Sequence, residues 1–304
     1  MDYAPIALFV YNRPGHTRQT VETLLANAEA AKSPLYIFSD APKNTAGEEA
    51  VSEVRRYIRG IGGFSTVHII ERAENYGLAR SIIDGVTNIC QEHGRVIVLE
   101  DDLIMSPYFL QYMNDALVRY EDQPEVVSIH GYSYPVSGKL PDTFFIRGAD
   151  CWGWGTWKRG WDIFEPDGEK LLAELERKNL THKFNYEGAY SFTNMLKEQI
   201  AGRNNSWAIR WHASAFLANR LTLYPGESLV RNIGFDSSGT HCGSSGGYDV
   251  DLAISPVASL NIPIEESIFA RAQIENYFRK THGGYGMRLA RYLKGLVRNF
   301  INKT

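Results

Sequence analysis

The chain has 304 residues, 44% of them hydrophobic, and a formal net charge of -3 at pH 7. This length and composition fit one large globular α/β domain, and the near-neutral charge does not indicate a nucleic-acid-binding protein. No apolar run approaches membrane-spanning length and the N-terminus lacks a signal-peptide pattern, so we expect neither a secreted nor an integral membrane protein. The three cysteines show no C-x-x-C spacing, which argues against a zinc or dithiol site and favours a cytoplasmic location.

Strands and helices alternate over roughly the first 120 residues of the chain. Apolar runs predict strands at Ile6–Tyr11, Leu35–Ser39, Thr66–Glu71 and Val96–Leu99. Helical patterns follow them, from Thr17 to about Ala31, over about Gly47–Ile61, from about Leu78, and from Pro107 to about Tyr120. This rhythm predicts a parallel sheet flanked by helices. After Pro124 the composition shifts toward strands, glycines and tryptophans, with one strand expected at Val126–His130.

An acidic cluster follows the fourth expected strand. The segment R-V-I-V-L-E-D-D-L-I-M-S-P, which begins at Arg95, runs from apolar Val96–Leu99 directly into Glu100, Asp101 and Asp102. Adjacent carboxylates repel one another unless a cation lies among them, and ligands of open α/β sheets bind at the carboxyl ends of the strands. Hard oxygen ligands favour Mg²⁺ or Mn²⁺, usually completed by substrate phosphates. The segment therefore predicts a metal and phosphate site; a solvated turn that caps the next helix is the alternative.

The loops after the other strands carry further candidate ligand-binding residues. The first loop contains Tyr11, Asn12 and Arg13. Asp40 follows the second strand, where it would accept the imide N–H of a pyrimidine base, or act as an ordinary turn residue. Arg80 begins the third helix, where it would grip a diphosphate, or lie as a solvated helix residue.

These motifs together resemble a known family. The run V-I-V-L-E-D-D-L-I-M-S-P-Y-F-L-Q-Y-M, preceded by F-V-Y-N-R-P and E-N-Y-G-L-A-R, is similar to the nucleotide-binding half of GT-A glycosyltransferases. The Glu-Asp-Asp motif is similar to that of N-acetylglucosaminyltransferase I and of bacterial family-2-like sugar transferases. The resemblance covers residues 4–245 and is most specific over 95–113. It implies an α/β GT-A fold, a Rossmann-like nucleotide-diphospho-sugar transferase with a mixed sheet flanked by helices.

The same resemblance assigns roles to the acidic residues. Asp102 would coordinate Mn²⁺ that bridges the diphosphate of the donor, while Glu100 and Asp101 would contact its sugar and ribose. Asp40 matches the residue that contacts the base. His241 lies in the glycine-rich stretch I-G-F-D-S-S-G-T-H-C-G-S-S-G-G, at the place of a histidine directed at the metal or diphosphate; a surface loop would have the same composition.

The expected domain covers residues 1–275, with a nucleotide-sugar-binding half at 1–125 and an acceptor-binding half at 126–275. The family places a Gly-Trp segment at the acceptor site, and the corresponding residues here are Trp152, Trp154 and Trp157. Aromatic faces suit a sugar, although a tryptophan-rich core is an equal alternative.

The catalytic base departs from the family pattern. An inverting transfer needs a carboxylate that takes the proton of the acceptor hydroxyl. The matching stretch R-N-N-S-W-A-I-R-W-H, from Arg203 to His212, contains no acid. Asp150 is our first substitute, followed by His212 and Glu227.

The tail at 276–304 carries seven Lys or Arg residues and no acid, so the net charge of -3 leaves -10 for the rest of the chain. Apolar residues recur at helical spacing between these basic residues: Leu289, Leu293, Leu296, Val297, Phe300 and Ile301. This predicts a C-terminal basic amphipathic helix. Residues 286–304 would lie on the inner face of the cytoplasmic membrane, or dock on the acidic body of the protein.

The sequence thus predicts a metal-dependent hexosyl- or N-acetylhexosaminyltransferase. It would move a sugar from a nucleoside diphosphate sugar, with UDP as the expected nucleotide, to a glycan or lipid-linked hydroxyl in cell-surface polysaccharide biosynthesis. A sugar-phosphate nucleotidylyltransferase is a second enzyme class, although N-R-P-G is a poor phosphate loop. A non-catalytic carbohydrate- or membrane-binding module is the third alternative, and it would bind no nucleotide.

Overall fold

The computed structural model describes residues 3–236 and 246–282. An eight-stranded sheet in the order β3-β2-β1-β4-β8-β6-β9-β7 forms its centre, and β5 and β10 form a separate two-stranded sheet. The strands are β1 (Ile6–Val10), β2 (Pro34–Ser39), β3 (Thr66–Glu71), β4 (Arg95–Glu100), β5 (Leu103–Met105), β6 (Val126–His130), β7 (Thr143–Arg147), β8 (Trp154–Trp157), β9 (Leu221–Pro225) and β10 (Val230–Asn232). The helices are α1 (Pro14–Leu25), α2 (Glu48–Ile58), α3 (Gly77–His93), α4 (Phe109–Arg119), α5 (Lys158–Trp161), α6 (Gly168–Arg177), α7 (Thr181–Phe184), α8 (Phe192–Ile200), α9 (Trp207–Leu217) and α10 (Ile268–His282).

The four strands expected in the first half form the parallel part of the sheet. Strand β1 pairs in parallel with β2 and β4, and β2 with β3. Strand β8 is antiparallel to β4 and β6, β9 is parallel to β6, and β7 is antiparallel to β9. The expected α/β class with a mixed sheet flanked by helices is confirmed. Because β1 to β4 are parallel, the loops that follow them leave the sheet at one edge.

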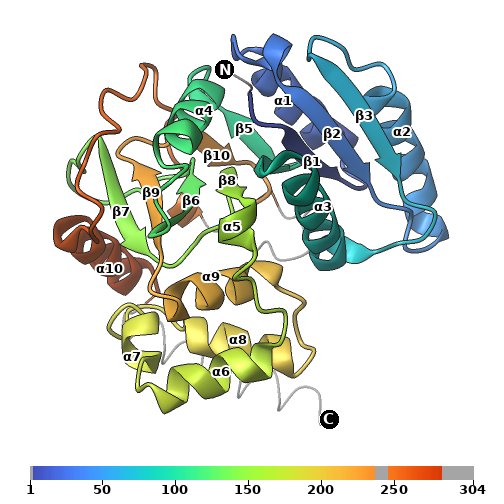
Figure 1. Ribbon diagram of the computed structural model, residues 1–304. Coiled ribbons are helices and arrows are strands. Elements are labelled where there is room, and N and C mark those ends of the chain that lie inside the picture. Colours follow the sequence, from blue (N-terminus) through green and yellow to red (C-terminus); the bar gives the residue numbers. More distant parts are fainter. Residues whose placement is uncertain (1–2, 237–245, 283–304) are drawn as a thin grey trace.

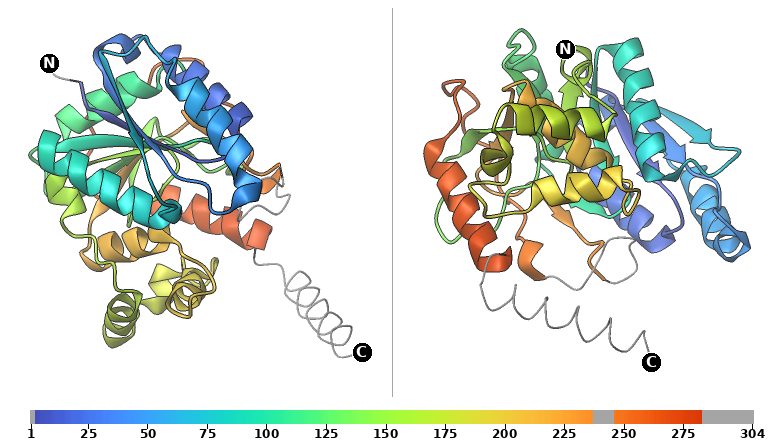
Figure 2. Two further views of the ribbon diagram at one scale, coloured as in Figure 1. Left: turned by 90° about the vertical axis from the view of Figure 1, so that its right-hand side faces the viewer. Right: turned by 90° about the horizontal axis from the view of Figure 1, so that it is seen from below.

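Helices cover both faces of this sheet (Figures 1 and 2). Successive residues of a strand face opposite sides, and in β1 Ile6 and Leu8 pack on the side of α1, α2 and α4. Ala7 and Phe9 pack on the opposite side, which α3, α5 and α9 cover. Burial on both faces explains why β1 and β4 are continuous apolar runs.

A helical subdomain, α6 to α9, interrupts the second half and was not expected from the sequence. Figure 1 shows these helices together beyond the edge of the sheet. Asp167 caps α6 by accepting hydrogen bonds from the backbone N–H groups of Glu169 and Lys170. Leucines and phenylalanines of all four helices form a core of their own: Leu171, Leu175, Phe184, Leu196 and Phe216.

The chain after the acidic loop also differs from the expectation. We expected a helix to start at Pro107, but Leu103–Met105 forms β5 and α4 begins at Phe109. Strand β5 pairs antiparallel with β10, with Leu103 opposite Asn232. The backbone N–H of Ile233 then donates to the Asp102 carbonyl at 2.8 Å. This pairing holds the segment after β10 against the acidic loop.

At the far edge of the sheet, Ala270, Ile274 and Phe278 of α10 pack against residues of β7 and β9. Within residues 3–236 and 246–282, no helix is long and apolar enough to cross a membrane. The expected amphipathic helix of 286–304 lies outside the described residues, so its membrane or docking role stays a prediction.

Candidate active site

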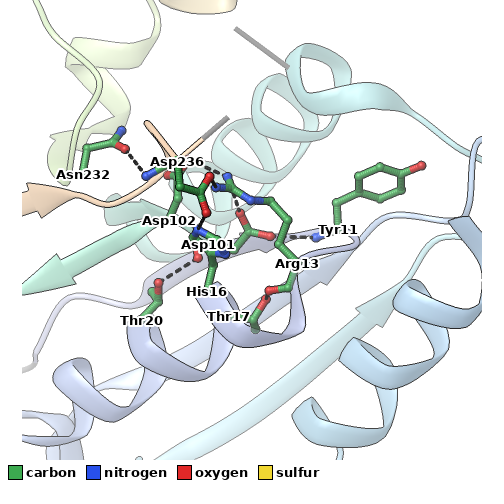
Figure 3. A network of polar contacts seen from close by, with 10 residues as sticks. Tyr11, Arg13, His16, Thr17, Thr20, Asp101, Asp102, Asn232 and Asp236 are labelled. Atoms are coloured by element: carbon green, nitrogen blue, oxygen red, sulfur yellow. Dashed lines mark hydrogen bonds and ion pairs between the residues drawn. The ribbon is translucent and has the colours of Figure 1, made fainter. Parts of the chain in front are cut away.

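The acidic loop lies at the carboxyl end of β4 and contacts the loop that follows β1 (Figure 3). Asp101 Oδ2 accepts a hydrogen bond from the Tyr11 backbone N–H at 3.1 Å. The Asp101 carbonyl accepts one from the Thr20 hydroxyl, which α1 presents, at 2.9 Å. These two bonds fix the acidic loop against the first strand-to-helix connection.

Arg13 is the counterion of these acids. Its Nη1 lies 2.9 Å from Asp102 Oδ2 and 4.0 Å from Asp101 Oδ1. Its Nη2 lies 3.8 Å from Asp236 Oδ1, and Asp236 also pairs with His16 Nε2 at 3.1 Å. Figure 3 shows the Arg13 side chain reaching between Asp102 and Asp236. One guanidinium thus connects the loop after β1, the acidic loop after β4 and the segment after β10.

The three consecutive acids are only partly compensated by this arginine. Burial, followed by the charge of Asp102, raises the pKa of Asp101 to about 7, against the opposing effects of Arg13 and the Tyr11 N–H. Burial and the charges of Asp102 and Asp101 raise the pKa of Glu100 well above its ordinary value. A carboxyl cluster whose ionisation is this costly favours a bound cation.

The donor set fits a hard divalent cation in its chemistry, because it consists of carboxylate oxygens at a strand end. Among residues 3–236 and 246–282, however, no three His, Cys, Asp or Glu side chains converge on one point as a metal cage. A cation bound to Asp102 would therefore need further ligands from other groups to complete its coordination. His241, the ligand that the family resemblance implies, lies outside the described residues.

Asp40 lies after β2, as expected, and is engaged by backbone groups. Its Oδ1 accepts from the Ala41 and Tyr76 N–H groups at 2.9 and 2.8 Å, and its Oδ2 accepts from Gly77 N at 2.8 Å. Gly77 is the first residue of α3, so the carboxylate caps this helix and attaches the loop after β3 to β2. The predicted contact with a nucleotide base stays a prediction.

The remaining nucleotide-site candidates line the same edge. The Tyr11 hydroxyl accepts a hydrogen bond from the Lys43 backbone N–H at 3.0 Å, and Figure 3 shows its ring pointing away from the acids. Asn12 is half-buried between Tyr11 and Arg13. Arg80 is exposed, pairs with Glu74 at 3.0 Å and lies 3.6 Å over the Tyr76 ring, so its predicted grip on a diphosphate would require it to leave Glu74.

The three tryptophans predicted at an acceptor site have different environments. Trp154 and Trp157 are buried, with exposed fractions of 0% and 3%. Trp154 stacks on Trp207 of α9, and Trp157 Nε1 donates to the Leu117 carbonyl at 3.0 Å. Helices α4 and α9 therefore cover these two side chains, and their predicted place at an acceptor site stays a prediction.

Trp152 alone among the three is only partly buried. Its backbone N–H donates to His130 Nε2 at 3.1 Å. Its ring packs edge-on against the rings of Phe235 and Tyr248, with centroid distances of 5.6 and 5.5 Å. Phe235 precedes Asp236, which pairs with Arg13. An aromatic wall of Trp152, Phe235 and Tyr248 therefore adjoins the acidic loop.

Asp150 lies in the link between β7 and β8, close to the aromatic wall and to the acidic loop. Its Oδ2 accepts a hydrogen bond from the buried Tyr134 hydroxyl at 2.6 Å, and its Oδ1 accepts the Cys151 backbone N–H at 2.9 Å. Burial raises the pKa of the Cys151 thiol well above its ordinary value, and the charges of Asp150, Glu100 and Asp102 add to this. The Cys151 thiol thus lies within the fields of both Asp150 and the acidic loop.

The other two base candidates are less well placed. His212 is buried on α9, where Nδ1 lies 2.7 Å from the Ala149 carbonyl and the rings of Phe184 and Phe192 enclose the imidazole. Burial lowers its pKa, so it is neutral and supports the link that carries Asp150. The predicted base role of His212 stays a prediction, and in this structure its ring is enclosed by aromatic side chains. Glu227 is exposed on the turn between β9 and β10.

Sequence reasoning missed Tyr134, Thr20, His16 and Asp236 as members of this site. Asp236 stands in the polar stretch that was singled out for His241, but its pairing with Arg13 joins residues more than two hundred positions apart. Gly234 was also not expected to belong to the site. A Cβ at this position would collide with the Asp102 carboxylate, so only glycine allows the segment to pass so close.

No family model and no curated protein matches the chain. Among solved structures it is similar to the mannosyltransferase PcManGT from Pyrobaculum calidifontis, solved with GDP-Man and Mn²⁺, at 16% identity over 44% of this chain and 37% of that chain, with a TM-score of 0.33. It is similar to residues 1–349 of TarS from S. aureus at 8% identity over 58% of this chain and 49% of that chain, with a TM-score of 0.34. The same TarS fragment in complex with UDP-GlcNAc matches at 8% identity over 46% and 37% of the two chains, with a TM-score of 0.33.

The chain thus spans less than half the length of the glycosyltransferases it matches. At these TM-scores the likeness carries no residue role to this protein. The function has to be inferred from the site itself.

The raised pKa of Asp101 predicts a pH-dependent stability in the presence of EDTA. Because the folded-state pKa of about 7 exceeds the ordinary value of 3.8, the native state binds this proton more tightly, and the free energy of unfolding falls as pH rises from about 4 to 7. At about 1.4 kcal/mol per pKa unit the loss is at most about 4 kcal/mol. Asp101→Asn lacks this group, so its free energy of unfolding should fall less between pH 5 and 8 in urea titrations.

Asp162→Asn is the matched control for this comparison, because Asp162 is exposed and pairs with Lys158 on the surface. It should follow the wild-type pH dependence. An equal decrease of stability in Asp101→Asn and wild type would show that Asp101 does not titrate in this range.

Proposed function

We propose that this protein is a metal-dependent glycosyltransferase that moves a sugar from a nucleoside diphosphate sugar to a hydroxyl of a glycan or lipid-linked acceptor. UDP is the proposed nucleotide, and cell-surface polysaccharide biosynthesis the proposed context. The observation that carries the proposal is the acidic loop, where Glu100, Asp101 and Asp102 crowd together at the carboxyl end of β4 with Arg13 as their counterion.

The position of the loop supports a nucleotide diphosphate in particular. Ligands of open α/β sheets bind at the edge where the parallel strands end, and the loops after β1, β2 and β4 all open there. Carboxylates alone would repel a diphosphate, whereas a divalent cation held by Asp102 would supply the positive charge that a leaving diphosphate needs. Arg13 supplies a second positive charge of fixed geometry at the same place.

The proposed transfer is a direct displacement at the anomeric carbon of the donor. The bond from this carbon to the diphosphate oxygen breaks with its electron pair going to the diphosphate, while the acceptor oxygen forms the new glycosidic bond from the opposite face. Asp150 is the proposed base that takes the acceptor proton. Attack from the face opposite the diphosphate would invert the anomeric configuration. The hydrogen bond from Tyr134 holds the Asp150 carboxylate in one orientation, so its second oxygen lies near the Cys151 backbone.

The partly buried aromatic wall supports the proposal that the acceptor binds between Asp150 and the acidic loop. Trp152 lies two residues from Asp150, and Phe235 precedes the Arg13 partner Asp236. Aromatic faces pack well on the C–H surface of a sugar ring. The loop after β1 reads N-R-P-G, a poor phosphate loop for a nucleotidylyltransferase, so transfer to a glycan is preferred here.

Metal-dependent nucleotide binding is the first expected property. Calorimetric titration of UDP into the wild type should show binding at least about tenfold tighter with Mn²⁺ than with EDTA. In Asp102→Ala this enhancement should disappear, because the carboxylate that holds the cation is gone. Asp162→Asn removes a surface acid instead and should keep the wild-type enhancement.

Wild-type protein that binds none of UDP, GDP, CDP and dTDP with Mn²⁺ would exclude the transferase and favour a non-catalytic module. If UDP bound tightly but its affinity depended neither on Mn²⁺ nor on the Asp102 side chain, the protein would have a nucleotide site that does not use a metal.

Loss of the base is the second expected property. Once a UDP-sugar and acceptor are found by screening for UDP release, Asp150→Asn should lower kcat by about a hundredfold or more without changing UDP affinity. Tyr134→Phe removes one hydrogen bond to the carboxylate and should lower kcat by about tenfold. Tyr132→Phe is its control, since the Tyr132 hydroxyl donates to the Tyr248 carbonyl instead. Near-normal turnover in Asp150→Asn would assign the base elsewhere.

A further inference from the structure

Arg13 lies at the position that a cation bound to Asp102 would need. Its Nη1 is 2.9 Å from Asp102 Oδ2, the same carboxylate to which the proposed function assigns the metal. In the described part of the chain, no other basic side chain lies within 4.0 Å of the Asp101 or Asp102 carboxylate. The resident positive charge of the acidic loop is therefore a protein side chain.

The hydrogen bonds of Arg13 differ from those of a structural arginine. Arg159 donates to three backbone carbonyls, those of Glu121, Val126 and Tyr120, at 2.7–2.8 Å. Arg13 makes one short bond, to Asp102, and its Nε and Nη2 are buried without a hydrogen-bond partner among the described residues. Buried N–H groups without partners are costly, so this guanidinium gains free energy when an acceptor arrives.

Charge and geometry together indicate that Arg13 and a divalent cation would exchange places at Asp102. A divalent cation and a guanidinium repel each other strongly when they share one carboxylate oxygen. The planar guanidinium is well suited to phosphate oxygens, because Nε and Nη2, the two nitrogens without a hydrogen-bond partner, can both donate to them. The second anchor, Asp236 at 3.8 Å, is half-exposed and weak, so it would not prevent the movement.

We propose that a divalent cation replaces Arg13 at Asp102 and that the released guanidinium binds the diphosphate of the donor. This inference rests on the proposed function and adds that the binding of the cation and the binding of the diphosphate are coupled. Without nucleotide, the cation has to displace Arg13 and binds weakly. With nucleotide, the displaced side chain finds its acceptor, so cation and diphosphate strengthen each other's binding by the same factor.

Calorimetric titration of Mn²⁺ alone tests the exchange. Arg13→Gln removes the resident charge, and its Mn²⁺ affinity in the absence of nucleotide should be about tenfold or more above that of the wild type. The factor by which UDP strengthens Mn²⁺ binding should be smaller in this variant than in the wild type. Arg18→Gln is the matched control, since Arg18 lies on the exposed side of α1 over the Tyr57 ring and should behave as wild type.

Unchanged or weaker Mn²⁺ binding by Arg13→Gln, or no binding by either protein, would overturn the exchange. Metal-dependent UDP binding by the wild type would leave the proposed function intact in that case. The absence of nucleotide binding would instead remove the function itself.

A second readout is measured on the wild type, and a variant is needed only to assign one resonance. The Arg13 Nε–H resonance, assigned by its loss in Arg13→Lys, should shift when diamagnetic Mg²⁺ saturates the site. A Mg²⁺ titration that reaches saturation by calorimetry and leaves this resonance in place would also overturn the proposal.

Discussion

The repulsion among three consecutive carboxyl groups at the end of a buried strand is the constraint on which this site depends. Strand β4 is covered on both faces, so it delivers Glu100, Asp101 and Asp102 to a place where their charge is poorly solvated. Arg13 compensates only part of that charge, through one short contact with Asp102. A cluster held in this state favours additional positive charge, as a site for a metal and a diphosphate would.

The neighbouring loops are arranged around this cluster by bonds that span long stretches of sequence. The Tyr11 N–H and the Thr20 hydroxyl hold the acidic loop to the first strand-to-helix connection. Asp40 ties the loop after β3 to the end of β2 by capping α3. The pairing of β5 with β10 brings the Gly234 to Asp236 segment over Asp102 from the other half of the chain. The two halves of the protein therefore meet at the acidic loop, where donor and acceptor would have to meet.

The parallel half of the fold was predictable because strands such as β1 and β4 are buried on both faces and leave continuous apolar runs. The expected bounds of β3 and β6, Thr66–Glu71 and Val126–His130, are those observed. The local sequence does not distinguish Trp152 from Trp154, because the difference lies in Trp207 and Trp211 of α9, which pack against Trp154 from a distant helix. The same reason explains why the pairing of Arg13 with Asp236 and the support of Asp150 by Tyr134 were not expected. Each is a tertiary contact that no local pattern in the sequence specifies.

A crystal structure with Mn²⁺ and UDP, with data collected at the manganese absorption edge, would test the central claim most directly. We expect an anomalous manganese peak within coordination distance of the Asp102 carboxylate and of the diphosphate oxygens. The uridine should extend along the loops after β1 and β2. A nucleotide bound away from the carboxyl edge of these strands, or manganese that avoids Asp102, would contradict it.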